Sequence, residues 1–399
     1  MLRWQVFPFI CGMENIEEKA CLCALNRIFG FEPKIGLTLI SHFGSALEVI
    51  RLGEDKIDKV IGPYSKYKGR ITPQAVKDAA SELETLAHRG ISFHGITEAS
   101  YPPLLRECED APIGLYVRST TPAEELWKRS AVSIVGTRDI SPYGKEWCRK
   151  IVNGLSTTTH KPVIVSGLAL GVDIEAHRSA IDYGLPTIAV MATGPDSIYP
   201  YRHRAFADTL ASTNGCALVT DYPPGTAPLP VHFLRRNRII AGLSGATVLV
   251  ESKSKGGGLM TCRLAFSYNR DVYALPGRID DTRSQGCNEL IRQKIAEPIS
   301  SVPALIESLG MTAAATGSQL NDRERLTIHY GRHLAAQDID IMTGMMALLR
   351  RKRGMTAEDL ALSLKIAYLK ASELIAFLEI DGFVTRDLFQ RCSINTKNL

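Results

Sequence analysis

Four short stretches of the sequence combine small residues with cations, which is typical of loops that bind phosphate groups. The first is Gly136-Thr137-Arg138, directly after the apolar run Val132-Val135. Glycine lets the backbone approach an anion, threonine adds a hydroxyl and an N–H, and arginine adds a planar fork that can hold a phosphate with two hydrogen bonds. An ordinary turn that carries a surface arginine would show the same three residues.

Two further stretches place small residues in front of predicted helices. One stretch begins with Ser166-Gly167. The other contains Lys253 and Lys255, followed by a run of three glycines that includes Gly257. Such residues leave the N–H groups of a helix N-terminus accessible to an anion. Tight packing in the first stretch, or a flexible surface loop in the second, would account for the same composition.

The remaining stretch is rich in arginine. Arg236-Asn237-Arg238 follows another arginine, and a completely apolar segment begins at Ile239. A solvated helix face would not change so abruptly, so we expect a buried helix whose N-terminal end presents the arginines.

Common catalytic motifs fail on this sequence. A Walker A loop would need Ser or Thr after Gly144-Lys145 and Gly at position 139, where Asp139 stands, and no Gly-x-Ser-x-Gly elbow occurs. Asp173 and His177 share one helix face, but no third metal ligand is marked near them. We interpret Asp173 as a brace for the helix start and His177 as its structural partner. We therefore expect no catalytic residue, no metal and no cofactor.

The elements that must position these stretches lie in the middle of the chain, between about Ser130 and Pro303. Six short apolar runs alternate there with helical segments, which predicts a parallel, doubly wound sheet covered on both faces. Such sheets bind ligands at the carboxyl ends of their strands, so the four stretches would line one positive crevice. A nucleotide pocket and a nucleic-acid groove both fit. The runs are Val132-Val135, Val163-Val165, Thr187-Val190, Ala217-Thr220, Thr247-Val250 and Val272-Leu275.

The flanking regions have helical patterns of their own. In residues 1–123 we expect two short helices separated by a break at Ile35-Gly36-Leu37, and a further helix from Pro73 to about His88. A helical hairpin with glycine can bind the DNA backbone, although a plain helical domain fits as well. Residues 311–341 are predicted to be a linker, and residues 342–399 three short helices and a terminal hairpin, as in a winged helix.

Composition limits the class of protein. The 399 residues are 45% hydrophobic and 22% charged with a net charge of +5, as in a folded soluble protein of two to three domains. Apolar runs fall far short of the ~20 residues of a membrane span. The nine cysteines form no Cys-x-x-Cys pair, and the N-terminus lacks a convincing secretory signal. We expect free thiols in the cytoplasm.

From Ser133 to about Ile299 the chain closely resembles the DprA/Smf family, the DNA-processing proteins of natural transformation. Departures from the family pattern are Leu234 for Pro, Gly256 for Ser and Cys262 for Ala. The matching motifs are Gly136-Thr137-Arg138, 166–169, 171–173, Ala176-His177, Tyr199-Pro200, 236–243, Val250-Glu251, Gly257, Leu259, Thr261, 275–277 and 286–291.

The resemblance implies a DNA-binding protein rather than an enzyme. Residues 124–310 would form a Rossmann-like, doubly wound, mostly parallel sheet domain, after a SAM-like or helix-hairpin-helix-like domain in residues 1–123. Such proteins hold and protect incoming single-stranded DNA, help to load the recombinase RecA, and act as homodimers formed through the Rossmann-like domain. The phosphate contacts expected here are Gly136, Thr137, Arg138, Ser166, Gly167, Arg236, Asn237, Arg238, Lys253, Lys255 and Gly257.

An alternative reading is a nucleotide-processing hydrolase on a lysine-decarboxylase-like Rossmann scaffold. Glu251 or Asp221, which both stand at predicted strand ends, would then act as acid or base. The same two acids would equally well hold loops by hydrogen bonds to neighbouring arginines and backbone. The flanks favour the DNA-binding reading, because a small-molecule hydrolase needs neither a helical hairpin domain nor a winged helix.

Overall fold

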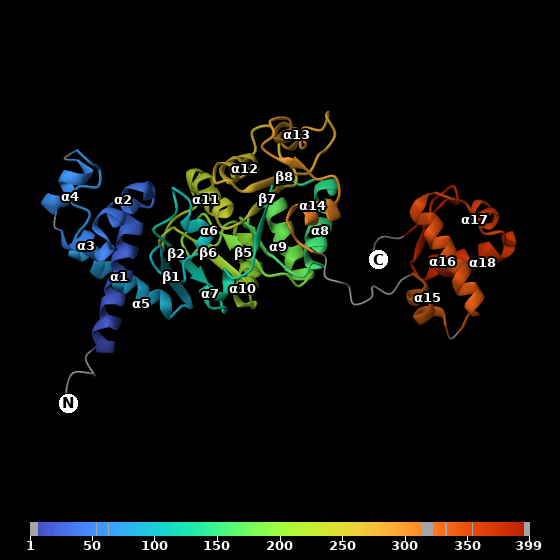
Figure 1. Cartoon of the computed structure of the whole chain (residues 1–399), viewed down its shortest axis with the longest axis horizontal. Helices are drawn as coiled ribbons and strands as arrows, with labels where there is room; N and C mark the ends of the chain where they lie inside the picture. The colour runs from blue at the N-terminus through green and yellow to red at the C-terminus, as the bar shows by residue number, and fades with distance from the viewer. Residues whose placement is uncertain are drawn as a thin grey trace. The chain divides into compact units, whose positions relative to one another are not determined.

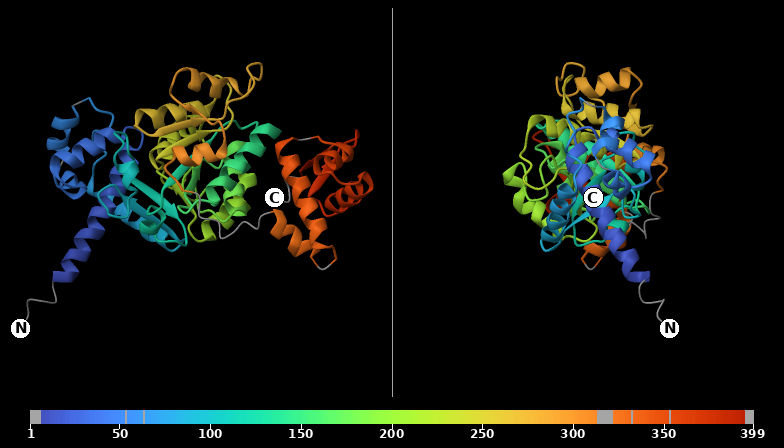
Figure 2. Two further views of the ribbon diagram at one scale, coloured as in Figure 1. Left: turned by 45° about the vertical axis from the view of Figure 1, so that its right-hand side comes forward. Right: turned by 90° about the vertical axis from the view of Figure 1, so that its left-hand side faces the viewer.

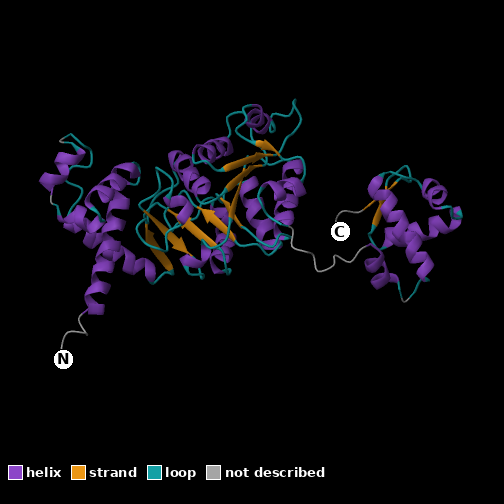
Figure 3. Cartoon of the chain, viewed as in Figure 1, coloured by secondary structure: helices purple, strands orange, loops and turns teal. Residues whose placement is uncertain are grey.

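The computed structural model describes residues 7–52, 54–62, 64–312, 322–331, 333–352 and 354–394. The chain divides into two compact units, Met1–Ala314 and Ala315–Leu399. Figure 3 shows that the first unit mixes strands and helices, whereas the second is mainly helical.

The first unit is built on a sheet whose described strands follow the order β1-β2-β6-β5-β4-β3-β7-β8-β9 (Figure 1). The strands from β6 to β9 are parallel, which confirms the predicted fold class. The six predicted runs match β3 to β8 to within one residue, because these strands are almost entirely buried and apolar. The parallel strands are β3 (Ala131–Val135), β4 (Val163–Ser166), β5 (Thr187–Val190), β6 (Ala217–Thr220), β7 (Ala246–Leu249), β8 (Asp271–Ala274) and β9 (Glu297–Pro298).

Two strands that the sequence did not reveal extend this sheet. β1 (Ile91–Gly95) and β2 (Gly114–Arg118) continue it beyond β6 in antiparallel orientation. They come from the region predicted to be helical and connecting. The sheet thus has an antiparallel edge on an otherwise parallel core.

Helices cover both faces of the sheet (Figure 2). Side chains of β3 alternate between the two faces. Val135 packs in the core beneath α11 (Pro230–Gly242) and α12 (Gly257–Ser267), whereas Val132 and Ile134 pack in the core beneath α8 (Pro142–Ser156), α9 (Val172–Asp182) and α14 (Val302–Ser308). The other helices from residue 103 to residue 292 are α6 (Pro103–Arg106), α7 (Ala123–Leu126), η1 (Tyr201–His203), α10 (Arg204–Ser212) and α13 (Gln285–Arg292).

The N-terminal helices pack around a separate core of the same unit. The predicted break at Gly36 is wrong, because Gly36 lies inside a helix and a Cβ there would overlap Ile113 Cδ1. This glycine serves close packing, and the helix ends at Gly44, whose φ is 90°. The helices are α1 (Phe7–Phe29), α2 (Pro33–Phe43), α3 (Ala46–Arg51), α4 (Glu54–Ile61) and α5 (Pro73–Ala87).

The second unit has its own core, in which Met342, Met345 and Leu374 are buried. Three helices and a hairpin occur where the sequence predicts a winged helix. Residues 313–321 and residue 332 of the predicted linker lie outside the described residues, and the described part of that range contains α15 and the start of α16. The elements are α15 (Asp322–Tyr330), α16 (Ala336–Arg351), α17 (Ala357–Leu364), α18 (Tyr368–Ile380), β10 (Val384–Arg386) and β11 (Cys392–Ile394).

Within the described residues, no helix has both the length and the apolar character that crossing a membrane requires.

Candidate nucleic-acid interface

A cleft of about 550 Å³ opens at the carboxyl edge of the sheet, where the loops after β3 and β7 adjoin. The strand order reverses at this point, which is where open α/β sheets bind ligands. Segments that are far apart in the sequence meet there. Eight of the predicted contact residues line the cleft: Gly136, Thr137, Arg138, Arg236, Asn237, Lys253, Lys255 and Gly257.

Glycines allow the loop after β3 to pack closely against the starts of α9 and α12. A Cβ on Gly136 would lie 2.6 Å from Val172 Cγ2, and a Cβ on Gly258 would lie 3.1 Å from Gly136 Cα. The backbone N–H of Thr137 donates to the Glu251 carbonyl at 2.7 Å. That N–H is therefore not available to a ligand, contrary to the sequence-based expectation, and Thr137 offers its hydroxyl instead.

Arg138 is the exposed cation of the β3 loop. Its guanidinium lies 5.3 Å from the ring centroid of Phe233, within the range of a cation–π contact. The neighbouring acid, Asp139, is paired with Arg283 at 2.9 Å. Arg138 itself forms no ion pair with any described residue, so its charge is directed to solvent and the cleft.

Arg236 supplies a buried cation at the wall of the cleft. Its Nη1 donates to the Val190 carbonyl, and its Nε has no hydrogen-bond partner among the described residues. A Cβ on Gly167 would overlap Nη1, so that glycine makes room for the guanidinium. Burial lowers the pKa of Arg236 to about 10, with Asp173 opposing and Arg138 reinforcing the shift. The group stays cationic at neutral pH and therefore contributes positive charge to the wall of the cleft.

Ser166 and Gly167 support the cleft from behind and do not line it. The Ser166 hydroxyl is fully buried and donates to the Ile134 carbonyl at 2.6 Å. Asp173 accepts from the Ala169 N–H at 3.4 Å, as the expected brace for the helix start. Burial raises the pKa of Asp173, while the charge of Arg236 opposes the rise.

His177, the other half of the conceivable metal pair, is fully buried, and its Nδ1 shares a hydrogen bond of 2.7 Å with the Thr187 hydroxyl. In the part of the chain that the structure describes, no three His, Cys, Asp or Glu side chains are grouped as metal ligands would be.

The loop after β7 presents two exposed ammonium groups, Lys253 and Lys255. It is anchored at Ser252, whose N–H donates to the Arg283 carbonyl at 2.8 Å. The loop leads into the N-terminus of α12, where Gly256 provides no side-chain cap. The positive end of the helix dipole therefore faces the same opening as the two lysines. Asn237 contacts this start, donating to the Gly257 carbonyl at 3.4 Å.

The position of Arg238 corrects the sequence-based picture. The helix begins at Pro230, so the arginines lie in its middle and not at its N-terminal end. Arg238 is 6% exposed, pairs with Asp221 and donates to the Asp110 carbonyl. It points away from the cleft, and we leave it out of the proposed contact set.

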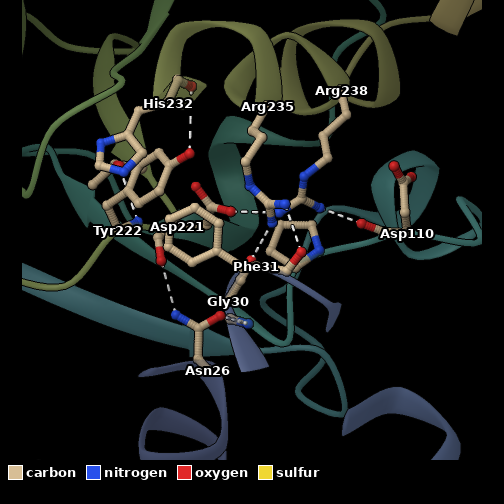
Figure 4. A network of polar contacts seen from close by, with 12 residues as sticks. Asn26, Gly30, Phe31, Asp110, Asp221, Tyr222, His232, Arg235 and Arg238 are labelled. Atoms are coloured by element: carbon tan, nitrogen blue, oxygen red, sulfur yellow. Dashed lines mark hydrogen bonds and ion pairs between the residues drawn. The ribbon is translucent and has the colours of Figure 1, made fainter. Parts of the chain in front are cut away.

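The network around Arg238 joins helix α1 to the sheet (Figure 4). Arg235 donates to the carbonyls of Gly30 and Phe31, which follow the last turn of α1. Asn26, on α1, donates to the Asp221 carbonyl at 2.9 Å. One of the three arginines of this stretch, Arg235, thus holds the end of α1 directly, whereas Arg238 binds Asp221 and the Asp110 carbonyl.

The family model described as DNA recombination-mediator protein A matches residues 92–310. The chain belongs to this family. The match covers every segment that lines the cleft and leaves out helices α1 to α5 and the second compact unit. The resemblance to the DprA/Smf family drawn from the motifs is thereby confirmed.

Relatives and a solved structure agree with this placement. The DNA processing protein DprA of Streptococcus pneumoniae is 35% identical over 254 residues, 62% of this chain and 86% of that protein. The protein Smf of a Synechocystis species is 34% identical over 305 residues, 73% of each chain. An X-ray structure of DprA from Streptococcus pneumoniae superposes with a TM-score of 0.59 at 30% identity, covering 71% of this chain and 95% of that one.

The two acids of the hydrolase alternative have structural partners in this family member. Asp221 is the buried counter-ion of Arg238. The Glu251 carboxylate accepts from the N–H of Ser141 at 2.9 Å and from its hydroxyl, and it lies where a Cβ of Gly144 would be. Glu251 thus fixes the start of α8. Both acids hold loops and helices in place.

Sequence reasoning missed Phe233 and Leu234, which also line the cleft. The only signal was their position directly before the arginine run. An apolar pair at that point is equally typical of a helix start that faces the protein core.

Proposed function

We propose that the chain binds single-stranded DNA through its phosphates in this cleft. The observation that carries the proposal is the set of cations around one opening, which comprises buried Arg236 in the wall and exposed Arg138, Lys253 and Lys255. The one acid in the lining, Asp173, is buried and its pKa is raised. A polyanion fits this imbalance, and Arg236 and Arg138 hold phosphate oxygens as forked donors.

The shape of the site favours a single strand over a duplex. The cations converge on a concave opening of about 550 Å³, into which a flexible backbone can bend. A duplex stays stiff over roughly 150 base pairs and cannot follow such curvature. The lining groups are phosphate donors rather than a set that reads base edges, so binding has little sequence preference.

Family membership supports the wider role. We propose that the protein works in the cytoplasm during natural transformation, where it protects incoming single strands and helps to load RecA. We propose further that it acts as a homodimer through the Rossmann-like domain. In this role the protein binds and hands over DNA and performs no turnover, and the engagement of Asp221 and Glu251 in structural contacts supports that division.

The test is equilibrium binding of fluorescent single-stranded and blunt duplex oligonucleotides at several salt concentrations. We expect tighter binding to the single strand and a linear fall of log affinity with log salt concentration, with a slope near −0.7 per phosphate neutralised. A flat salt response, or tighter binding to the duplex, contradicts the proposal.

A parallel assay covers the hydrolase alternative: release of base or phosphate from nucleotides, with and without magnesium. We expect none above background. Turnover that is lost in Glu251→Gln or Asp221→Asn, in protein shown to be folded, would establish the enzyme instead.

A further inference from the structure

Three aromatic side chains near the cleft have no part in phosphate binding. Phe233 is half-buried and lines the cleft, while Tyr199 and Tyr201 are 47% and 74% exposed. We call these three residues the aromatic row. Phenyl and phenol rings left in water beside a ligand cleft offer flat apolar surface that a ligand can cover.

The aromatic row is continuous with the proposed phosphate site. The Arg138 guanidinium lies 5.3 Å from the Phe233 ring centroid, and that ring lies 5.3 Å from the Tyr199 ring at an interplanar angle of 63°. Two residues further along the chain, the Tyr201 ring has the Arg204 guanidinium 5.8 Å from its centroid. Phe233 and Tyr199 therefore adjoin the cation proposed to hold a phosphate, and Tyr201 follows in the same segment of the chain.

Tethers hold the segment that carries the two tyrosines. Before them, the Asp196 carboxylate accepts from the Gly225 N–H at 3.0 Å. After them, the His203 Nδ1 donates to the Leu168 carbonyl at 2.9 Å. A surface whose backbone is fixed on both sides loses little conformational entropy when a ligand covers it.

We propose that the aromatic row is a stacking platform for the bases that neighbour the phosphate held in the cleft. The proposal rests on the single-stranded DNA binding proposed above. Every base has a π face, so stacking on aromatic rings adds affinity with little sequence preference. Arg138 is an exposed cation beside Phe233, and Arg202 and Arg204 are exposed on the segment that carries the tyrosines, where the Asp208 carboxylate lies 4.0 Å from Arg204. Exposed arginines beside the rings suit a strand that carries one phosphate per base. A protein partner that buried the row would have to desolvate these charges.

The experiment compares oligothymidine with an abasic oligonucleotide of equal length, which keeps the phosphates and removes the bases. Binding to the full chain is measured by fluorescence anisotropy at one salt concentration. Tyr199→Leu removes a ring and keeps apolar volume, while Tyr64→Leu is the matched control, because Tyr64 is fully exposed and lies outside the row.

We expect the wild-type chain to bind oligothymidine more tightly than the abasic strand. Tyr199→Leu should weaken oligothymidine binding about 5- to 150-fold, the range for loss of one stacked base, and leave abasic binding unchanged. Tyr64→Leu should change neither. Equal wild-type affinity for the two strands, or equal losses on both in a folded Tyr199→Leu variant, overturns the platform while phosphate binding stands. Binding of neither strand by the wild-type chain refutes the proposed function itself.

Discussion

Replacement of Arg138 by alanine tests the proposed phosphate site most directly. The residue follows β3 at the carboxyl edge, is exposed, and forms no ion pair with any described residue, so its removal leaves no buried charge unpaired. The substitution also removes the cation–π interaction with the Phe233 ring, which contributes about 0.5–1 kcal/mol at an exposed site. We therefore expect a folded protein with a nearly unchanged melting temperature.

The expected loss of affinity follows from exposure. A hydrogen bond to a charged group contributes about 1.5–3 kcal/mol, and screening of an exposed guanidinium reduces this to about 1–2 kcal/mol. That corresponds to a dissociation constant roughly 5- to 30-fold higher for oligothymidine. Because one phosphate is no longer neutralised, the slope of log affinity against log salt should also become shallower by about 0.7.

Arg129→Ala is the matched control. Arg129 is likewise exposed but precedes β3, at the opposite end of the strand from the cleft. Both variants lose one positive charge, so a general charge effect would weaken binding equally in both. Fluorescence anisotropy with oligothymidine measures the two side by side. Equal losses, or wild-type binding by both, would show that the loop after β3 is an ordinary turn.

Three further outcomes follow from the same contacts. Gly167→Ala should displace Arg236, which lies against this glycine, and weaken oligothymidine binding about 5- to 30-fold. Gly245→Ala is the control, because this glycine has open space around it, and it should bind as tightly as wild type. Identical affinities of the two variants would contradict the packing argument. Asp221→Ala should lower the free energy of unfolding by about 3–5 kcal/mol in urea titrations, because Arg238 is left buried and unpaired; a loss below ~1 kcal/mol would show that water reaches the pair. A chain that ends at Ala314 should stay folded and retain oligothymidine binding, since the cleft lies wholly in the first compact unit; a stable but non-binding fragment would assign binding to the second unit.

The sequence was sufficient to predict the parallel core and the cationic loops that line the cleft. The six inner strands are apolar throughout and separated by helices, and their loops meet at one edge by topology alone. β1 and β2 escaped prediction because each is only five residues long and begins or ends with glycine, and β1 has only two large apolar residues, Ile91 and Phe93. Short strands of that kind are recognisable only once the sheet edge that they pair with is known.

The arginine run shows where sequence reasoning stops. Successive helical residues are about 100° apart, so Arg236 and Arg238 point to nearly opposite faces of α11. Which of them lines the cleft depends on how the helix is set against the sheet. The sequence does not reveal how the helix is rotated about its axis. Only the structure shows that Arg236 lines the cleft and that Arg238 binds Asp221.

Arg235 and Asn26 form hydrogen bonds between helix α1 and the sheet region, and these bonds affect where the protein can be shortened. Arg235 neutralises the negative end of α1 by binding two carbonyls there, and Asn26 is bound both to the Asp221 carbonyl and to the N–H of Gly114. A shortened gene product that started at the family-matched residue 92 would leave an arginine, an aspartate carbonyl and a strand amide without their partners. We therefore expect a fragment without the N-terminal helices to be less stable than the whole first unit, so a shorter version of this protein should be trimmed from the other end.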